Sequence, residues 1–294
     1  MTAGRPVVGL LHPGAMGVAI GAALVAHGLR VAWASEGRSR FTTDRAHEAG
    51  LEDAGTLADL VRACDEIVSV VPPDAAGATV EAVLAAGFRG RYVDANAIPP
   101  DRARELAERI EAAGGRFVDG GIVGRPPGPD ESAWIHLSGP DAVEVAGWFA
   151  SGRFAARVLG DRIGDASALK VAFASWTKGA TALKAAMLAY AEATGVREAL
   201  RAQWDEIEPG FLDAAESRVA GTVPKAWRFE GEMRGIADAF AAAGTPDGFH
   251  LAAAEAYRRM APLRAADAPD RRPEIEEVLA AMRAGDTDGG AGGA

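Results

Sequence analysis

Short, continuous runs of apolar residues recur along the first half of the chain, and amphipathic stretches separate them. Strands that read as unbroken apolar runs are buried on both faces of a sheet, and strands that alternate with helices pair in parallel. The runs lie at 7–11, 31–34, 67–71, 91–94 and 116–119, with helical spacing at 15–27, 75–86 and 101–113. Two more strands are expected at 132–137 and 154–159. The pattern predicts an α/β domain with a mostly parallel, doubly wound sheet over residues 1–160.

The apolar spacing becomes helical throughout the second half of the chain. Helical signals run almost unbroken from Asp165 to about Gly195 and return at 198–204, 231–243, 249–260 and 273–284, and no strand-like run follows Leu159. We therefore expect an all-α domain over 161–284 and a disordered tail rich in Gly and Asp over 285–294. Several helices are Ala-rich and strongly apolar, and the chain is too short to cover all of their faces by itself. This predicts a homodimer formed through the helical domain.

Composition and charge exclude several classes of protein. The chain has 294 residues, of which 49% are hydrophobic and 24% charged, a balance typical of a folded globular protein. A net charge of −10 argues against a nucleic-acid binder. No stretch is apolar enough for a membrane span, no signal peptide fits before Val7, and the lone Cys64 allows neither an internal disulfide nor a cysteine zinc site. We expect a cytoplasmic protein with no metal, membrane or nucleic-acid partner.

The loop after the first predicted strand carries the strongest chemical signal. It reads His12-Pro13-Gly14-Ala15-Met16-Gly17, and its glycines occupy the last two positions of the G-x-G-x-x-G pattern that binds dinucleotides. We expect Gly14 to let the backbone approach a pyrophosphate and Gly17 to let the helix pack close to the strand. The helix N-terminus offers free N–H groups and partial positive charge to an anion. His12 replaces the first glycine, and Pro13 offers another route to the turn.

The end of the second predicted strand bears on which coenzyme binds. An acidic residue there would hold the ribose 2′-hydroxyl of NAD, and an arginine would suit the 2′-phosphate of NADP. The segment Ser35-Glu36-Gly37-Arg38-Ser39-Arg40 contains both kinds of residue. Because a hydroxyl followed by Arg-Ser-Arg suits a phosphate, we favour NADP bound by Ser35, Arg38 and Ser39, with NAD held near Glu36 as the alternative.

Four stretches of the sequence resemble the β-hydroxyacid dehydrogenase family, which includes 3-hydroxyisobutyrate dehydrogenase and is related to phosphogluconate dehydrogenase and the imine reductases. They are 9–17, 94–97 (Asp-Ala-Asn-Ala), 119–124 (Asp-Gly-Gly-Ile-Val-Gly) and 164–170 (Gly-Asp-Ala-Ser-Ala-Leu-Lys). The stretches 167–179, 225–227 and 246–250 resemble a subgroup whose helical C-terminal domain has no assigned function. The resemblance spans nearly the whole chain and implies a Rossmann domain joined by a long helix to an all-α domain, commonly dimeric.

The resemblance implies that Lys170, six positions after Gly164, is the catalytic residue. A lysine can protonate a carbonyl or imine while a hydride arrives, if its pKa falls from about 10.4 toward neutrality. Lys178 is the competing donor, or it could lower the pKa of Lys170 by like-charge repulsion. On an ideal helix, Thr177 lies about 20° and Lys178 about 80° around the axis from Lys170. Among the histidines, His136 is expected in an edge strand.

The remaining site residues are assigned by their places in the same pattern. Val71, Pro72 and Asn96, at the ends of two predicted strands, are assigned to the cofactor. The residues assigned to the substrate are Asn96, Ile122, Val123, Gly124, Ala174, Thr177, Lys178 and Glu232. The family's carboxylate-binding serine falls on Val123 and its asparagine on Ala174. The groups that hold a small hydroxy acid in the family are therefore largely missing.

These observations predict an NAD(P)-dependent oxidoreductase that transfers a hydride between NADPH and a small carbonyl or hydroxy compound. An imine reductase on the same fold is the first alternative, because the hydroxy-acid clamp is missing. A dinucleotide-binding sensor without turnover is the second. Cofactor oxidation against ketoacids, aldehydes and cyclic imines separates the three.

Overall fold

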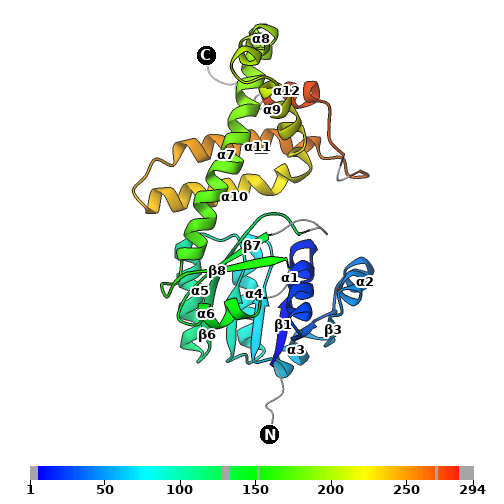
Figure 1. Cartoon of the computed structure of the whole chain (residues 1–294), viewed down its shortest axis with the longest axis vertical. Coiled ribbons are helices and arrows are strands. Elements are labelled where there is room, and N and C mark those ends of the chain that lie inside the picture. The colour runs from blue at the N-terminus through cyan, green and yellow to red at the C-terminus, as the bar shows by residue number, and fades with distance from the viewer. Residues whose placement is uncertain (1–5, 128–132, 151–152, 269–270, 285–294) are drawn as a thin grey trace, which may run out of the picture. The chain divides into compact units, whose positions relative to one another are not determined.

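The strand-forming runs pair into one eight-stranded sheet (Figure 1). The structure, a computed structural model, describes residues 6–127, 133–150, 153–268 and 271–284. The sheet contains β1 (Val7–Leu11), β2 (Arg30–Trp33), β3 (Glu52–Asp53), β4 (Glu66–Ser69), β5 (Arg91–Asp94), β6 (Arg116–Val123), β7 (Ala133–Ser138) and β8 (Phe154–Gly160). The expected strands are thus present, and their ends agree with the apolar runs to within a few residues. Ser132, expected to begin one of them, lies outside the described residues.

The order of the strands defines the fold class. Sheet neighbours follow β3-β2-β1-β4-β5-β6-β7-β8, and all pairs are parallel except β6 with β7. The expected doubly wound, mostly parallel sheet is confirmed. The order reverses between β1 and β4, the kind of switch point at which open α/β sheets bind ligands. The expectation that His136 lies in an edge strand is wrong, because β8 pairs with the outer side of β7.

Helices cover both faces of this sheet. They are α1 (Ala15–Ala26), α2 (Arg40–Glu48), α3 (Leu57–Ala63), the 3-10 turn η1 (Pro73–Ala75), α4 (Ala76–Ala85), α5 (Pro100–Ala112), α6 (Ala142–Gly147) and the beginning of α7 (Asp165–Ala193). Along β1, Val8 and Leu10 pack with α1 and α6, whereas Leu11 belongs to the core formed with α3, α4 and α5. Alternate residues of a strand point to opposite faces, so β1, β2, β4, β5 and β6 each contribute to both cores.

The apolar pattern does not predict α2, α3, α6 or β3. These elements bury little: in α2 only Ala46 is buried, and both residues of β3 are exposed. Local capping accounts for two of the helices. The Ser39 hydroxyl accepts a hydrogen bond from the backbone N–H of Thr42 at the start of α2, and Thr56 does the same for Asp59 in α3. Capping signals, rather than periodicity, mark such short helices.

The second half of the described chain is helical, and the expected all-α region is confirmed. Its elements are the remainder of α7, α8 (Arg197–Ile207), α9 (Phe211–Ala220), α10 (Val223–Ala242), α11 (Gly248–Met260), the 3-10 turn η2 (Ala261–Leu263) and α12 (Ile275–Arg283). The sequence pattern does not predict α9, and α10 begins at Val223 rather than at Gly231. The helix continues through Gly231 because Val223, Ala226 and Met233 form one buried face.

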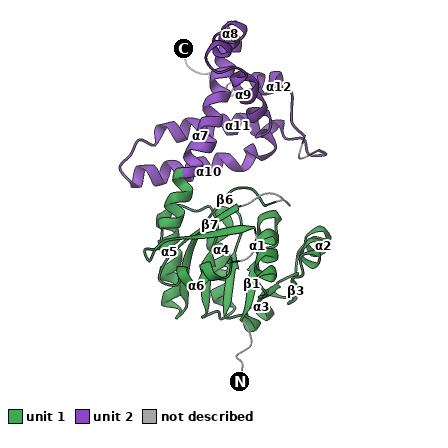
Figure 2. Ribbon diagram, in the orientation of Figure 1, with its two compact units in different colours: residues 1–172 green, residues 173–294 purple. Residues whose placement is uncertain are grey.

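The chain divides into two compact units, residues 1–172 and 173–294 (Figure 2). The division falls inside α7 rather than between residues 160 and 161, because the first turns of α7 pack against β6: a Cβ atom at Gly121 would meet the carbonyl oxygen of Ala166. The expected tail at 285–294 lies outside the described residues. Of the helices formed by described residues, none has the length and apolarity that a membrane crossing requires.

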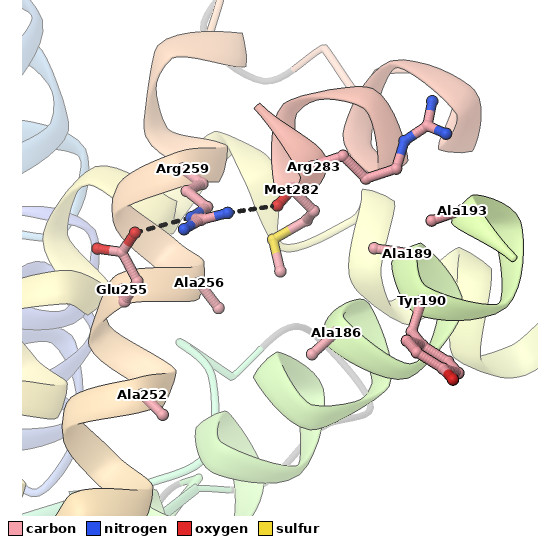
Figure 3. Close-up of a pocket in the computed structure, with 10 residues that line it drawn as sticks. All are labelled: Ala186, Ala189, Tyr190, Ala193, Ala252, Glu255, Ala256, Arg259, Met282 and Arg283. Atoms are coloured by element: carbon pink, nitrogen blue, oxygen red, sulfur yellow. Dashed lines mark hydrogen bonds and ion pairs between the residues drawn. The ribbon is translucent and has the colours of Figure 1, made fainter. Parts of the chain in front are cut away.

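Unit 2 contains a hollow of about 300 Å³ between α7, α11 and α12 (Figure 3). Its lining consists mostly of small side chains with a few large ones: Ala186, Ala189, Tyr190, Ala193, Ala252, Glu255, Ala256, Arg259, Met282 and Arg283. Arg259 donates to Glu255 and to the carbonyl oxygen of Met282, both at 2.7 Å, so its charge is satisfied within the wall. None of the residues assigned to the cofactor or the substrate lines this hollow.

Candidate functional site

The loop between β1 and α1 has the form of an anion-binding site. Gly14 is the N-cap of α1, is exposed, and has an extended backbone with φ −66° and ψ −174°. A Cβ atom at Gly14 would meet no heavy atom within 4 Å, so the space beside this backbone is open. Within the described residues no side chain caps α1, and its first turn has no acidic residue. The first turn, which contains Ala15 and Met16, therefore presents N–H groups and the positive end of the helix dipole. These features fit the pyrophosphate of a dinucleotide.

Residue 17 must be glycine because of the loop that precedes α1, rather than because of β1. A Cβ atom at Gly17 would lie 2.0 Å from the carbonyl oxygen of His12, a distance that no side chain tolerates. The close packing of α1 against β1 depends instead on Gly21, where a Cβ atom would lie 3.0 Å from Leu10 and 2.9 Å from Leu51. The role expected for Gly17 is therefore corrected: it lets the loop fold tightly over α1.

The segment after β2 lies beside this loop. Arg38 donates from its guanidinium to Nε2 of His12 at 2.7 Å, and its backbone N–H donates to the carbonyl oxygen of Ser35 at 3.0 Å. Ser39 is the N-cap of α2, so its hydroxyl already holds a helix end. Arg45, which the sequence analysis did not select, donates to the carbonyl oxygen of Pro13 at 3.5 Å and lies over the ring of Phe41 at 4.4 Å. The segment thus brings two guanidinium groups to the loop.

Asn96 joins the ends of β4 and β5. Its side-chain oxygen accepts from the backbone N–H of Val71 at 2.6 Å, and its amide nitrogen donates to Ser69 Oγ at 3.2 Å and to Asp94 at 2.9 Å. The side chain is therefore engaged within the protein and holds the two strand ends together. Val71 is half-buried and Pro72 is exposed at the same edge of the sheet. Val71, Pro72 and Asn96, which were assigned to the cofactor, thus lie together, and the hydrogen bonds of Asn96 link the ends of β4 and β5.

Asp94 and Asp119 are buried carboxyl groups that the sequence analysis did not assign. They are register partners on β5 and β6. Burial, with the charge of Asp119 as a smaller cause, raises the pKa of Asp94 to about 7. Asp119 accepts hydrogen bonds from the backbone N–H groups of Gly164 and Ser167 at 3.0 and 2.9 Å, and from the Ser167 hydroxyl at 2.7 Å. Asp119 thereby anchors the first turn of α7 and complements its dipole. The available signal was an acidic residue at the end of each apolar run in the sequence: Asp94 ends β5, whereas Asp119 lies inside β6.

Lys170 lies on the anchored part of α7 beside the end of β6. Its Nζ donates to the carbonyl oxygen of Ile122 at 2.5 Å, and the side chain is half-buried. The helix reaches the strand because residue 121 is glycine: a Cβ atom there would lie 2.6 Å from the Ala166 carbonyl oxygen. His136 pairs with Gly121 across β6 and β7; burial is the main cause that lowers its pKa, and the charge of Lys170 adds to it. Lys170 and Ile122, assigned to different roles, are thus in contact.

The other residues assigned to the substrate differ in their surroundings. Val123 is buried and Gly124 exposed at the end of β6. In unit 2, Ala174 is buried, and the Thr177 hydroxyl donates to the carbonyl oxygen of Phe173 in its own helix at 3.1 Å.

Lys178 is paired within unit 2. It forms an ion pair with Glu232, and the two side chains are 16% and 15% exposed. Its ammonium lies 4.9 Å from the centre of the Phe229 ring, and the Tyr257 hydroxyl donates to its carbonyl oxygen at 2.8 Å. Lys178 and Glu232, both assigned to the substrate, do lie together. Among the described residues, no group of three or more His, Cys, Asp or Glu side chains could hold a metal ion.

Two family models match the chain. Residues 7–144 match the NAD binding domain of 6-phosphogluconate dehydrogenase, and residues 191–260 match a domain of unknown function, DUF1932. No curated protein matches the sequence.

Solved structures extend the comparison to nearly the whole chain. A conserved protein of unknown function, described as structurally similar to 3-hydroxyacid dehydrogenases, is 28% identical over 86% of this chain and 97% of its own, with a TM-score of 0.65. The 3-hydroxyisobutyrate dehydrogenase of Mycobacterium tuberculosis is 18% identical over 95% of this chain and 100% of its own, with a TM-score of 0.67. The reductive aminase of Aspergillus terreus, in complex with NADPH4, cyclohexanone and allyl amine, is 23% identical over the same shares, with a TM-score of 0.54.

The fold, the dinucleotide loop and the matched domain together define the class of protein. Residues 7–144 of the chain form an NAD binding domain of the 6-phosphogluconate dehydrogenase type. The expected relationship is confirmed, because the first part of the chain matches that domain, the helical part matches the domain of unknown function, and the 28% identical neighbour is described as similar to 3-hydroxyacid dehydrogenases.

Proposed function

We propose that the chain is an NADPH-dependent reductase of small carbonyl or imine compounds, with Lys170 as the proton donor. NADPH, when bound, supplies the hydride. The single observation that carries the proposal is the contact between Lys170 Nζ and the Ile122 carbonyl oxygen, 2.5 Å apart at the end of β6. The strand ends that carry the dinucleotide loop, Val71 and Asn96 belong to the same sheet, and ligands of such sheets bind outside the carboxyl ends of the strands. A cation held there is suited to protonate the oxygen or nitrogen of the substrate.

The surroundings of Lys170 suit a proton donor. Asp119 and Gly121 set the position of α7 against β6, and the carbonyl oxygen of Ile122 orients the ammonium group. Catalysis by proton transfer depends on such orientation, because the donor must lie within hydrogen-bond reach of the reacting atom. The residues that fix Lys170 are all in unit 1, so the proposed donor and the dinucleotide loop belong to the same compact unit.

An imine substrate is the second candidate, and the apolar residues Val123 and Ala174 favour it. Both are buried, and neither can bind the carboxylate of a small hydroxy acid. The reductive aminase neighbour contains cyclohexanone and allyl amine, which carry no carboxylate. Rates of NADPH oxidation with ketoacids, aldehydes and cyclic imines distinguish the candidates, and the absence of turnover with NADPH bound would indicate a sensor.

Replacement of Lys170 by Met tests the assignment of the proton donor. Lys170→Met keeps the length of the side chain and removes its proton, so we expect turnover to fall by about 10²–10⁴-fold with NADPH affinity unchanged. Lys184→Met, on the same helix with its ammonium over Phe211, is the matched control and should keep normal turnover. A loss of less than about tenfold in Lys170→Met, together with loss of most activity in Lys178→Met, would transfer the role to Lys178.

We also propose that the protein acts as a homodimer formed through residues 165–284. Several large apolar side chains of unit 2 are exposed, among them Trp176, Leu183, Trp227 and Phe249. Burial of such side chains is the usual driving force of protein association.

A further inference from the structure

Arg38 and His12 form a contact that joins the coenzyme loop to the segment after β2. Arg38 is exposed and His12 is half-buried, and 2.7 Å separates Nη2 of Arg38 from Nε2 of His12. Arginine has no hydrogen-bond acceptor, so the imidazole nitrogen must accept and His12 must be neutral. Burial, and the charge of Arg38 as a smaller cause, lowers the pKa of His12 to about 4, in agreement with a neutral ring. The proton of the ring then lies on Nδ1, which is buried without a hydrogen-bond partner among the described residues.

The charge of Arg38 is not compensated by this contact. Other arginines of the same region form ion pairs with carboxylates, such as Arg30 with Glu52 and Arg62 with Asp59. Within the described part of the chain, no carboxylate lies at ion-pair distance from Arg38 or from Arg45. In a chain with a net charge of −10, two guanidinium groups with undiminished charge stand beside the uncapped end of α1. The structure thus holds a cationic group ready for an anion.

We propose that His12 is a positioning residue that holds Arg38 in place for the 2′-phosphate of NADPH and thereby sets the preference for NADPH over NADH. The inference rests on the proposed function, because it requires that NADPH bind at the loop.

An imidazole suits this role better than the usual partners of arginine. A carboxylate would orient the guanidinium equally well, but its negative charge would cancel that of Arg38 and repel a phosphate dianion. With no partner, the long side chain of Arg38 would have to be ordered when the ligand binds, at the expense of affinity. A neutral acceptor restricts the rotamers of Arg38 and leaves its charge intact. The histidine at the first position of the dinucleotide pattern, where glycine is usual, thus has a physical reason.

The experiment measures coenzyme binding to the full-length protein by isothermal titration calorimetry. The ligands are NADPH and NADH, together with 2′,5′-ADP and 5′-AMP, which isolate the contribution of the 2′-phosphate. His12→Phe keeps a planar ring without an acceptor, and we expect it to weaken NADPH and 2′,5′-ADP by about tenfold while NADH and 5′-AMP change by less than about twofold. His12→Gln provides a side-chain oxygen as acceptor and should restore most of the preference. In the Arg38→Ala background, His12→Phe should have no further effect, because the two residues act through one contact.

The outcomes separate the inference from the proposed function. If the unmodified protein binds neither coenzyme, both are overturned. If it prefers NADPH and His12→Phe keeps that preference, only the inference is overturned. Equal weakening of NADPH and NADH in both His12→Phe and His12→Gln would mean that His12 merely supports the loop, which also contradicts the inference. His12→Ala replaces His12→Phe if the bulkier variant does not fold.

Discussion

At the residue scale, Asp94 is the buried group whose titration bears most directly on stability. Its carboxylate is fully enclosed at the end of β5, and it accepts hydrogen bonds from the backbone N–H and the side chain of Asn96 at 3.0 and 2.9 Å. Those bonds favour the charged form, but burial outweighs them and raises the pKa to about 7. The folded protein therefore binds this proton more tightly than the unfolded chain does. The stability that Asp94 contributes is present at low pH and is lost as the pH rises from about 4 through about 7.

Replacement of Asp94 by Asn should remove this pH dependence. Asparagine keeps an acceptor for the N–H of Asn96 and does not titrate. We expect the free energy of unfolding of the unmodified protein, minus that of Asp94→Asn, to fall by at most about 1.4 kcal/mol per pH unit between pH 4 and 7. Urea unfolding of both proteins across this range measures the difference. Asp74→Asn, at an exposed carboxylate, is the control and should run parallel to the unmodified protein. Parallel profiles for Asp94→Asn would contradict the assignment.

At the element scale, the packing of α7 against β6 sets the position of Lys170, the proposed proton donor. Asp119 provides hydrogen-bond acceptors for the first turn of α7, and Gly121 provides the space that the helix occupies. Neither residue touches the reacting atoms in this interpretation. They act through Lys170, whose Cβ would lie 3.2 Å from a Cβ at residue 121.

Gly121→Ala should displace α7 from β6. The added methyl group would lie 2.6 Å from the Ala166 carbonyl oxygen, so the helix must shift, at a cost of about 1–3 kcal/mol in stability. Because Lys170 moves with the helix, we expect kcat to fall by at least about tenfold while NADPH affinity changes little. Gly147→Ala in α6 is the matched control, since a Cβ atom there meets nothing within 4 Å. Thermal unfolding and steady-state kinetics measure both effects. An unshifted Tm in Gly121→Ala would refute the packing argument.

At the scale of the whole molecule, the helical unit leaves several large apolar side chains exposed. Trp176 is 75% and Tyr190 71% exposed, and Tyr190 stands at the rim of the hollow between α7, α11 and α12 (Figure 3). Exposed aromatic side chains of this size on one unit commonly mark a protein interface. The proposed homodimer would cover them.

Light scattering should therefore give twice the chain mass of 30.3 kDa. Tyr190→Lys places a charge in the proposed interface and should shift the protein toward the monomer at micromolar concentration, with NADPH binding by the first unit retained. Val143→Lys, at a 73% exposed position of α6 in the first unit, is the matched control and should remain dimeric. A monomer in the unmodified protein would exclude this mode of assembly.

Sequence alone determined the architecture of this protein, because the patterns that specify its elements are local in the chain. Continuous apolar runs predicted the parallel strands, and helical spacing predicted α1, α5 and α7. The loop 12–17 indicated a dinucleotide site because its glycines are close together in the chain, and the resemblance of the short stretch 164–170 to the family predicted Lys170 as the proton donor. The periodicity of apolar residues shows which face of a helix or strand is buried. This can be read without knowing which other element covers that face.

The tertiary structure decided which side chains meet, because those contacts depend on strand register and helix position. Arg38 meets His12 across 26 residues and Ser167 meets Asp119 across 48, and neither separation has a period that a sequence displays. Asn96 was assigned to ligands, yet its amide is engaged by Val71 and Asp94 once β4 and β5 lie in register. Arg45 comes to Pro13 only because α2 forms on the cap that Ser39 provides. Local sequence specifies the elements, and the hydrogen bonds between distant residues appear only when the packing of those elements is complete.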